Sequence, residues 1–219
     1  PLVAVWGVGF RDGRKYTLPE CRYLIRFLKS EAGGRCAVML GVPFYWREQR
    51  RDCVDAEELP AILAEADVLS PWSVGRFRNP NEVATRVQLH WRADQAKCRA
   101  RSQAYLPVVF PGFSWRNLKL GKTKSNQIPR FGGQFLWQQF VSAKKAGAEM
   151  LYIAMFDVVD EVTAIVKCTN YPPIGASPFI YNENLPTDHY LLLPAQRARF
   201  LRRPQELPVG TQCRPPWSP

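Results

Sequence analysis

The 219-residue sequence predicts one α/β domain built on a parallel sheet. Five short apolar runs recur along the chain, and a helical pattern follows each of them. The runs are nearly continuous in apolar character rather than alternating, which is typical of strands buried on both faces. Because no long linker separates these units, we expect a single domain over residues 1–219, ending in an irregular tail at 204–219.

The five apolar runs predict strands near residues 2–8, 36–41, 67–71, 105–110 and 150–156. Five strands are too few to close a standard barrel of eight. The residues alone therefore leave two architectures open, an open doubly wound sheet and part of a (β/α)8 barrel. No Gly-x-Gly-x-x-Gly motif follows the first run, which argues against a Rossmann-type dinucleotide site.

The helices between these strands are marked by capping signals. "TLPE" (17–20), "DAEE" (55–58) and "NPNE" (79–82) each place a capping side chain three residues before a glutamate. Gly147 is a plausible helix stop. The predicted helices cover residues 18–31, 56–65, 80–102, 131–146 and 188–203.

Charge and hydropathy restrict the classes of partner. The net charge of +11 comes from 30 Lys and Arg against 19 Asp and Glu, and it is compatible with anionic partners. The charge is scattered, with local clusters only at 119–124 and 197–203. We interpret it as a solvated basic surface and expect no nucleic-acid partner. No apolar run approaches 18 residues, so we expect no membrane partner.

The sequence contains six cysteines, none of them in a Cys-x-x-Cys pair and each on a different predicted element. This spacing predicts no metal site, and we expect no cofactor. Buried free thiols and one or two long-range disulfides both remain open. The cellular location is open as well, secretion included.

Ligands bind at the carboxyl ends of the strands in both architectures. Aromatic residues follow four of the five predicted strands, accompanied by polar side chains. Aromatic rings pack against the C–H faces of sugars, and polar side chains bind sugar hydroxyls. A single tryptophan is more commonly a packing residue, but the set together favours a carbohydrate cleft. The predicted substrate-binding residues are Trp6, Tyr45, Trp46, Trp72, Arg76, Trp115 and Asn117.

The fifth apolar run ends in three acids, Asp157, Asp160 and Glu161. Glycoside hydrolysis needs two carboxyl groups, one as acid and one as base or nucleophile. Acids three or four residues apart on one loop can supply both, although surface loops are often acidic. We therefore take Glu161, Asp157 and Asp160 as candidate catalytic residues.

Three long segments resemble the glycoside hydrolase family 71/99-like proteins: "VAVWGVGFRDGRKY" (3–16), "LPVVFPGFSWRNL" (106–118) and the segment 127–165 that contains the acids. Such proteins are labelled xylosidase/arabinosidase or endo-α-mannosidase-like, and the resemblance covers roughly residues 2–195. It implies a (β/α)8 TIM-type barrel, here a partial barrel of about five parallel strands with outer helices. About three amino-terminal βα units would be absent, which leaves two open sheet edges. We expect the first strand to pair with a second copy of the chain or another segment, as in a homo-oligomer, or the missing units to exist in a longer polypeptide.

The resemblance also implies a catalytic pair. In catalytic relatives of family 99, two glutamates three residues apart act as base and acid around an α-mannoside, and the sugar's own 2-hydroxyl attacks. The second glutamate matches Glu161, but the first position is Val158, and Val162 replaces the glycine expected after the second. Either Asp157 or Asp160 substitutes, or the site is inactive. The protein is then a glycosidase, or a non-catalytic carbohydrate-binding or structural protein on a degenerate barrel.

Overall fold

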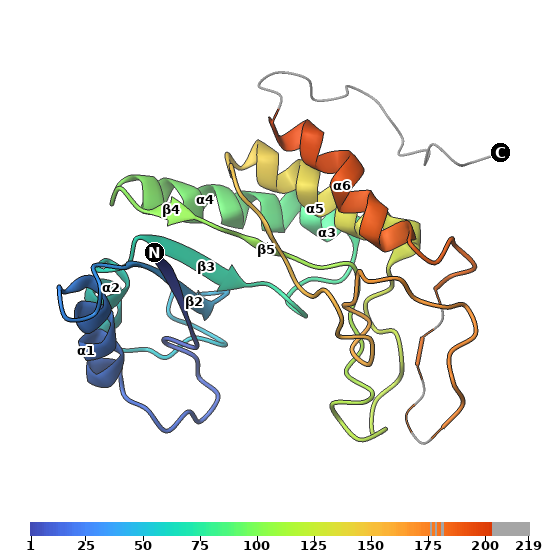
Figure 1. Cartoon of the computed structure of the whole chain (residues 1–219), viewed down its shortest axis with the longest axis horizontal. Helices are drawn as coiled ribbons and strands as arrows, with labels where there is room; N and C mark the ends of the chain where they lie inside the picture. The colour runs from blue at the N-terminus through green and yellow to red at the C-terminus, as the bar shows by residue number, and fades with distance from the viewer. Residues whose placement is uncertain (176, 178, 181, 203–219) are drawn as a thin grey trace.

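The computed structural model describes residues 1–175, 177, 179–180 and 182–202. Four parallel strands pair in chain order to form the main sheet, and two more form a second parallel sheet (Figure 1). The main sheet contains β1 (Leu2–Trp6), β2 (Ala37–Pro43), β3 (Val68–Trp72) and β4 (Ala104–Tyr105), and the second contains β5 (Val108–Val109) and β6 (Tyr152–Ile153).

Helices follow the strands and pack on one side of the sheets (Figure 1). Helix α1 contacts β2, α4 contacts β4, and α5 contacts β5. The parallel sheet with outer helices is thus confirmed. The helices are α1 (Leu18–Lys29), α2 (Leu59–Leu63), α3 (Pro80–Glu82), a π-helix (Val83–Val87), α4 (Gln88–Arg99), a 3-10 turn (Phe131–Gly133), α5 (Gln134–Lys145) and α6 (His189–Arg202).

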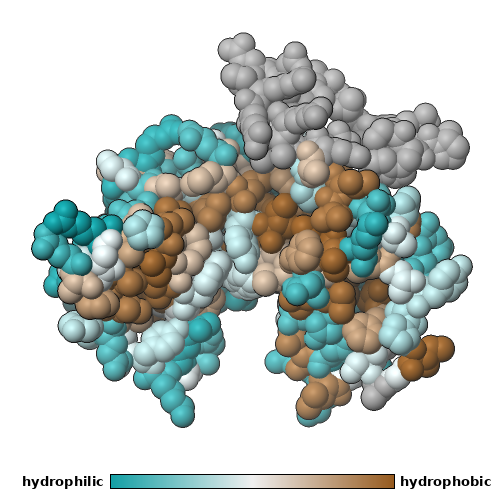
Figure 2. All heavy atoms as spheres, viewed as in Figure 1, coloured by the Kyte–Doolittle hydropathy of each residue, from teal (hydrophilic) through white to brown (hydrophobic). Residues whose placement is uncertain are grey.

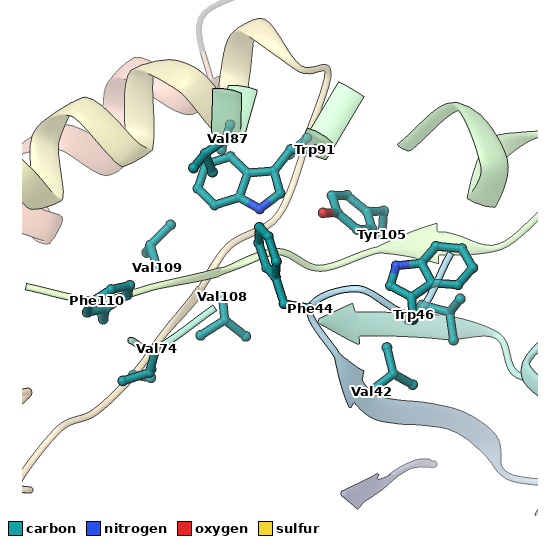
Figure 3. Packing of buried hydrophobic residues seen from close by; sticks show 14 of the residues in the cluster. Val42, Phe44, Trp46, Val74, Val87, Trp91, Tyr105, Val108, Val109 and Phe110 are labelled. Atoms are coloured by element: carbon teal, nitrogen blue, oxygen red, sulfur yellow. The ribbon is translucent and has the colours of Figure 1, made fainter. Parts of the chain in front are cut away.

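The hydrophobic core lies between the strands and these helices (Figure 3). Val42 of β2, Phe44 beyond it, Val108 of β5 and Trp91 of α4 are all fully buried. Burying side chains of this size contributes about 1.5–3 kcal/mol each. Packing of the outer side of the sheet therefore fixes where each strand ends and where its following loop begins.

The single strand expected over 105–110 is wrong, because the chain changes partner strand at Pro107. Proline has no backbone N–H and cannot continue a ladder on that side. Leu106 still donates to the Leu69 carbonyl of β3 at 2.9 Å, whereas the Pro107 carbonyl accepts from Tyr152 of β6 at 3.1 Å. The last strand is also shorter than expected, and its paired residues are Tyr152 and Ile153.

The helix expected over 56–65 begins later, at Leu59. The predicted capping box of Asp55 is not formed, and Glu58 at the capping position makes no side-chain hydrogen bond to the helix. The cause is a competing contact, because the Ala56 N–H donates to Gln49 Oε1 at 3.0 Å. The segment before α2 is therefore held as a loop.

Other predicted helix ends are confirmed. Thr17 Oγ1 accepts from the Glu20 N–H at 3.3 Å, and the Glu20 carboxylate accepts from the Thr17 N–H at 2.6 Å. Asn79 caps the next long helix through the Glu82 N–H, at 2.9 Å. Gly147 follows α5 with φ at 92°, a left-handed conformation that glycine adopts without strain.

Among the described residues, five cysteines are free thiols, and Cys213 lies outside that part of the chain. The predicted tail at 204–219 also lies outside it. Within the described ranges, no helix has the length and apolar content needed to cross a bilayer.

Candidate functional site

Three aromatic side chains meet at the carboxyl ends of β1 and β3 and on β6. The ring centroids of Trp6 and Trp72 lie 5.4 Å apart in an edge-to-face arrangement, and Trp6 lies 5.7 Å from Tyr152. The Trp6 ring covers Gly41 of β2, where a Cβ atom would approach Trp6 Cε3 to 1.8 Å. Trp6 remains 37% exposed, so this aromatic cluster (Trp6, Trp72 and Tyr152) presents ring surface to solvent.

A cavity of about 300 Å³ opens on the aromatic cluster, at the lower end of the range for ligand sites. The Arg14 guanidinium and Met155 also line it. Met155 is the first residue of the loop 155–166 that carries the three acids, so this cavity connects the ends of β1 and β3 with the start of that loop. The sequence did not single out Tyr152, because it lies inside an apolar run and reads as core.

The acid-bearing loop (residues 155–166) is closed by backbone hydrogen bonds at its base. The Met155 N–H donates to the Thr163 carbonyl at 3.0 Å, and the Ile165 N–H donates back to the Met155 carbonyl at 3.1 Å. Across the loop, the Thr163 N–H and Oγ1 both donate to the Val158 carbonyl at 3.2 Å. The loop is therefore a defined structure that sets the position of its acids.

The three acids differ in environment. Asp157 and Asp160 are exposed, whereas Glu161 is half-buried. Burial raises the pKa of the Glu161 carboxyl, and the neighbouring Asp160 carboxylate raises it further. A raised pKa keeps a carboxyl protonated for longer as pH increases, which is what a general acid requires.

The loop after β5 holds the acid-bearing loop in place. Asn117 Nδ2 donates to the Asp160 carbonyl at 3.0 Å, and the Ser114 N–H donates to the Glu161 carbonyl at 2.8 Å. The ring of Trp115 packs on Gly75, where a Cβ atom would lie 2.8 Å from Trp115 Cζ2. The predicted residue Asn117 thus lies next to the acids, with its amide bonded to the backbone, whereas the ring of the predicted residue Trp115 lies against Gly75.

A buried arginine holds the far end of the acid-bearing loop. Arg130 donates through Nε and Nη2 to the Val162 carbonyl at 3.2 and 3.0 Å, and through Nη2 to the Ala164 carbonyl at 2.8 Å. Its guanidinium lies 4.3 Å from the ring centre of Tyr190. Burial lowers the pKa of Arg130. No local pattern in the sequence predicts this role, because the contacts are with backbone atoms more than 30 residues along the chain.

The two departures from the family pattern lie within this loop. Val162 has φ at 67°, a left-handed conformation that is an outlier for a β-branched residue and natural for glycine. The resemblance places a glycine at this position. Val158 is half-buried and has no titratable group, so position 158 supplies no carboxyl.

Two predicted substrate-binding residues lie away from the aromatic cluster. Trp46 and Tyr45 are 4% and 3% exposed, and both belong to the hydrophobic core (Figure 3 shows Trp46). The Asp52 carboxylate accepts from the N–H groups of Phe44 and Tyr45 at 3.0 and 3.3 Å, which holds the backbone that follows β2. Trp46 therefore has no free ring face for a sugar.

Arg76, the remaining predicted residue, forms an ion pair with Asp52 at 3.0 Å. It follows β3 and lines a separate cavity of about 610 Å³, which Trp72 also lines. Within the described residues, no group of three or more His, Cys, Asp or Glu side chains could hold a metal ion.

The molecule has two lobes with a hollow between them (Figure 2). The loops 7–17 and 44–56 lie in one lobe, and the loops 113–130 and 155–175 lie in the other (Figure 1). The first lobe carries the loops that follow β1 and β2, and the second carries the acids. The candidate residues thus come from both sides of this hollow.

The fold resembles that of solved glycoside hydrolase family 99 (GH99) structures. The GH99 endo-alpha-mannosidase from Bacteroides thetaiotaomicron matches with a TM-score of 0.58 and 18% identity, over 91% of this chain and 65% of that chain. Its complex with bis-tris-propane matches with a TM-score of 0.57 and 19% identity, over 82% and 55% of the two chains. This chain thus spans less than two thirds of the length of those structures.

No protein-family model and no curated protein matches the sequence. The structural likeness does not support a xylosidase or arabinosidase assignment. At this level of identity it establishes the fold, which is an α/β partial barrel of parallel strands similar to GH99 structures.

Proposed function

We propose that this protein binds an oligosaccharide of the α-mannoside class at the aromatic cluster, and that it hydrolyses glycosidic bonds weakly or not at all. The observation that carries the proposal is the exposed ring surface of Trp6 beside Trp72 and Tyr152, over a cavity at the strand ends. The GH99 structures of this fold are described as endo-alpha-mannosidases, which supports the choice of sugar.

We expect weak hydrolysis because the site has a candidate general acid but carries no carboxyl group at position 158, where the second one is expected. Glu161 is the candidate general acid, because it is half-buried and its pKa is raised. A second carboxyl group is needed as base or nucleophile. Position 158 carries valine, and the remaining acids Asp157 and Asp160 are exposed. We therefore expect binding to survive without efficient chemistry, because packing against aromatic rings does not require that carboxylate.

A second candidate function is an active glycosidase. The raised pKa of Glu161 favours it, and Asp157 or Asp160 would act as the second carboxyl group. The two functions differ in turnover rather than in binding, so one set of ligands distinguishes them.

The binding half is tested by calorimetry with a panel of α-mannan oligosaccharides. We expect Trp6→Ala to weaken binding about tenfold, since an aromatic contact contributes roughly 0.5–1.5 kcal/mol beyond area burial and 1.4 kcal/mol is a factor of ten. Tyr23→Ala is the matched control, because Tyr23 is 75% exposed on α1 and lines none of these cavities. Absence of binding to every glycan tested, neutral or acidic, would contradict a carbohydrate function.

The catalytic half is tested with the same oligosaccharides by following product formation. We expect little turnover by the natural chain and an increase in Val158→Glu, which supplies a carboxyl three residues before Glu161. Val158→Gln is the control, because it has nearly the same shape without the charge. Robust turnover by the natural chain would favour the active glycosidase instead.

A further inference from the structure

A second cavity, of about 540 Å³, lies beside the end of β2 and is lined by five arginines against two glutamates. Its volume is in the range of ligand sites. An excess of guanidinium groups in a concave site attracts anions and gives bidentate hydrogen bonds to oxyanions. The arginines are Arg47, Arg50, Arg51, Arg76 and Arg86.

Tyr45 contacts three of these arginines, through its hydroxyl and through its ring. Its hydroxyl accepts from Arg51 Nη1 at 2.9 Å and from Arg86 Nη1 at 3.3 Å. The guanidinium groups of Arg50 and Arg51 lie 5.0 and 4.8 Å from the centre of its ring. Because Tyr45 is buried, the ring is fixed, and it gathers the positive groups at the cavity.

The charges in this cavity are only partly balanced. Arg76 pairs with Asp52, and Arg86 pairs with Glu82. In the part of the chain that the structure describes, Arg50 and Arg51 form no ion pair with a carboxylate. Both are exposed, so their guanidinium groups are available to a ligand.

The position of Arg86 has a separate structural cause. The long helix from Pro80 to Arg99 contains a π-helical turn, Val83–Val87, that includes Arg86. Such turns are rare and occur frequently at functional sites. Val83 and Val87 in the same turn are fully buried, so packing fixes the turn that directs Arg86 to Tyr45.

The basic cavity continues towards the aromatic cluster. An adjoining cavity of about 610 Å³ shares Arg51 and Arg76 with it and is also lined by Trp72 and Arg14. Trp72 and Arg14 in turn line the 300 Å³ cavity at the aromatic cluster. A ligand with its sugar ring on Trp72 could therefore extend along a continuous surface to Arg51.

We propose that Arg51, Arg86 and Tyr45 form an oxyanion site that receives a sulfate, phosphate or carboxylate substituent of the bound saccharide. The substrate class is then an acidic glycan rather than a neutral one. The inference rests on the proposed function for the saccharide, whereas binding of the anion itself can be measured alone.

Calorimetry with an α-mannan oligosaccharide, its sulfated form, an oligomannuronate and sodium sulfate tests the proposal. We expect the sulfated or carboxylated form to bind about tenfold more tightly than the neutral form, and sodium sulfate to compete with it. Arg51→Gln should remove this preference and leave affinity for the neutral form unchanged, because Arg51 forms no ion pair with a carboxylate of the described residues that the substitution would break. Arg99→Gln, an exposed change of equal charge at the end of α4, should retain the preference.

The outcomes separate the two proposals. Equal binding of neutral and acidic forms would overturn the oxyanion site and leave the carbohydrate function standing. Binding of sodium sulfate that depends on Arg51, with no saccharide bound, would overturn the carbohydrate function and the acidic-glycan class together. If Arg51→Gln and Arg99→Gln lost the preference for the acidic form equally, the preference would reflect the net charge of the protein and not the oxyanion site. Tighter, Arg51-dependent binding of a single-stranded oligonucleotide of matched charge would identify nucleic acid as the partner instead.

Discussion

The guanidinium of Arg130 donates two hydrogen bonds to the backbone carbonyl of Val162, at 3.0 and 3.2 Å, in an interior where Arg130 is only 6% exposed. Val162, which has a left-handed backbone, is thus the residue whose carbonyl the buried arginine binds. This contact links the segment before α5 to the acid-bearing loop and places Glu161 directly before the anchored carbonyl.

Replacing the buried arginine should destabilise the protein and loosen the acid-bearing loop. Arg130→Met keeps much of the volume but leaves the carbonyls of Val162 and Ala164 without donors, which we expect to cost about 2–4 kcal/mol. Urea unfolding measures the loss, and faster hydrogen exchange at the Thr163 N–H locates it. Arg99→Met, on the surface, is the control; equal stability of the two variants would show that Arg130 anchors nothing.

Glycine at position 162 should be tolerated although the site is buried. Val162→Gly loses roughly 2 kcal/mol of side-chain burial but relieves about 1–2 kcal/mol of left-handed strain, so the net change should stay within about 1.5 kcal/mol. Val109→Gly in β5, also buried but in an ordinary strand conformation, should cost about 3 kcal/mol or more. Similar losses in both unfolding curves would rule out strain at Val162.

The buried carboxyl of Asp94 should give stability an unusual pH dependence. It accepts from Arg47 Nε at 2.9 Å and from the Tyr105 hydroxyl at 3.2 Å, and burial raises its pKa to about 6. Since the folded pKa exceeds the unfolded one, the stabilising contribution is complete below about pH 4 and declines as pH rises through about 6.

Comparison with Asp94→Asn isolates this contribution. The free energy of unfolding of the natural chain, relative to the variant, should fall by about 2 kcal/mol between pH 4 and pH 7. The nearby His90, with Nε2 3.4 Å from Asp94 Oδ2, is removed from the comparison by introducing His90→Gln into both chains. A difference that stays constant with pH would contradict the titration of Asp94.

The outer edge of β1 should mediate self-association. The Ala37 N–H donates to the Pro1 carbonyl and the Gly7 N–H to the Gly41 carbonyl, so alternation along β1 directs the Ala4 N–H away from β2. No strand of the described residues pairs with that side. We expect light scattering to give a mass above the 25.1 kDa of one chain.

Proline at this edge should weaken the association. Ala4→Pro removes an outward N–H and leaves the ladder with β2 intact, because edge strands tolerate proline on their solvent side. Circular dichroism checks that the fold is retained. A monodisperse species of 25.1 kDa for the natural chain would show that the edge does not pair.

Local patterns in the sequence determined the parallel α/β architecture and several helix ends. The continuous apolar runs predicted β1, β2 and β3, and the Thr17 and Gly147 signals predicted where helices begin and end. These features depend on residues a few positions apart, so propensity and periodicity are sufficient to find them. The substrate-binding and catalytic roles of the candidate residues remain predictions.

Tertiary structure decided which of the similar residues face a cavity. Trp6 and Trp46 are both predicted substrate-binding residues at strand ends, yet one covers Gly41 with an exposed ring and the other lies in the core. Tyr152 joins the aromatic cluster, and Arg86 reaches Tyr45 from a π-helical turn, through contacts between residues distant in sequence. Such contacts depend on how the strands and helices pack, so no local pattern contains them.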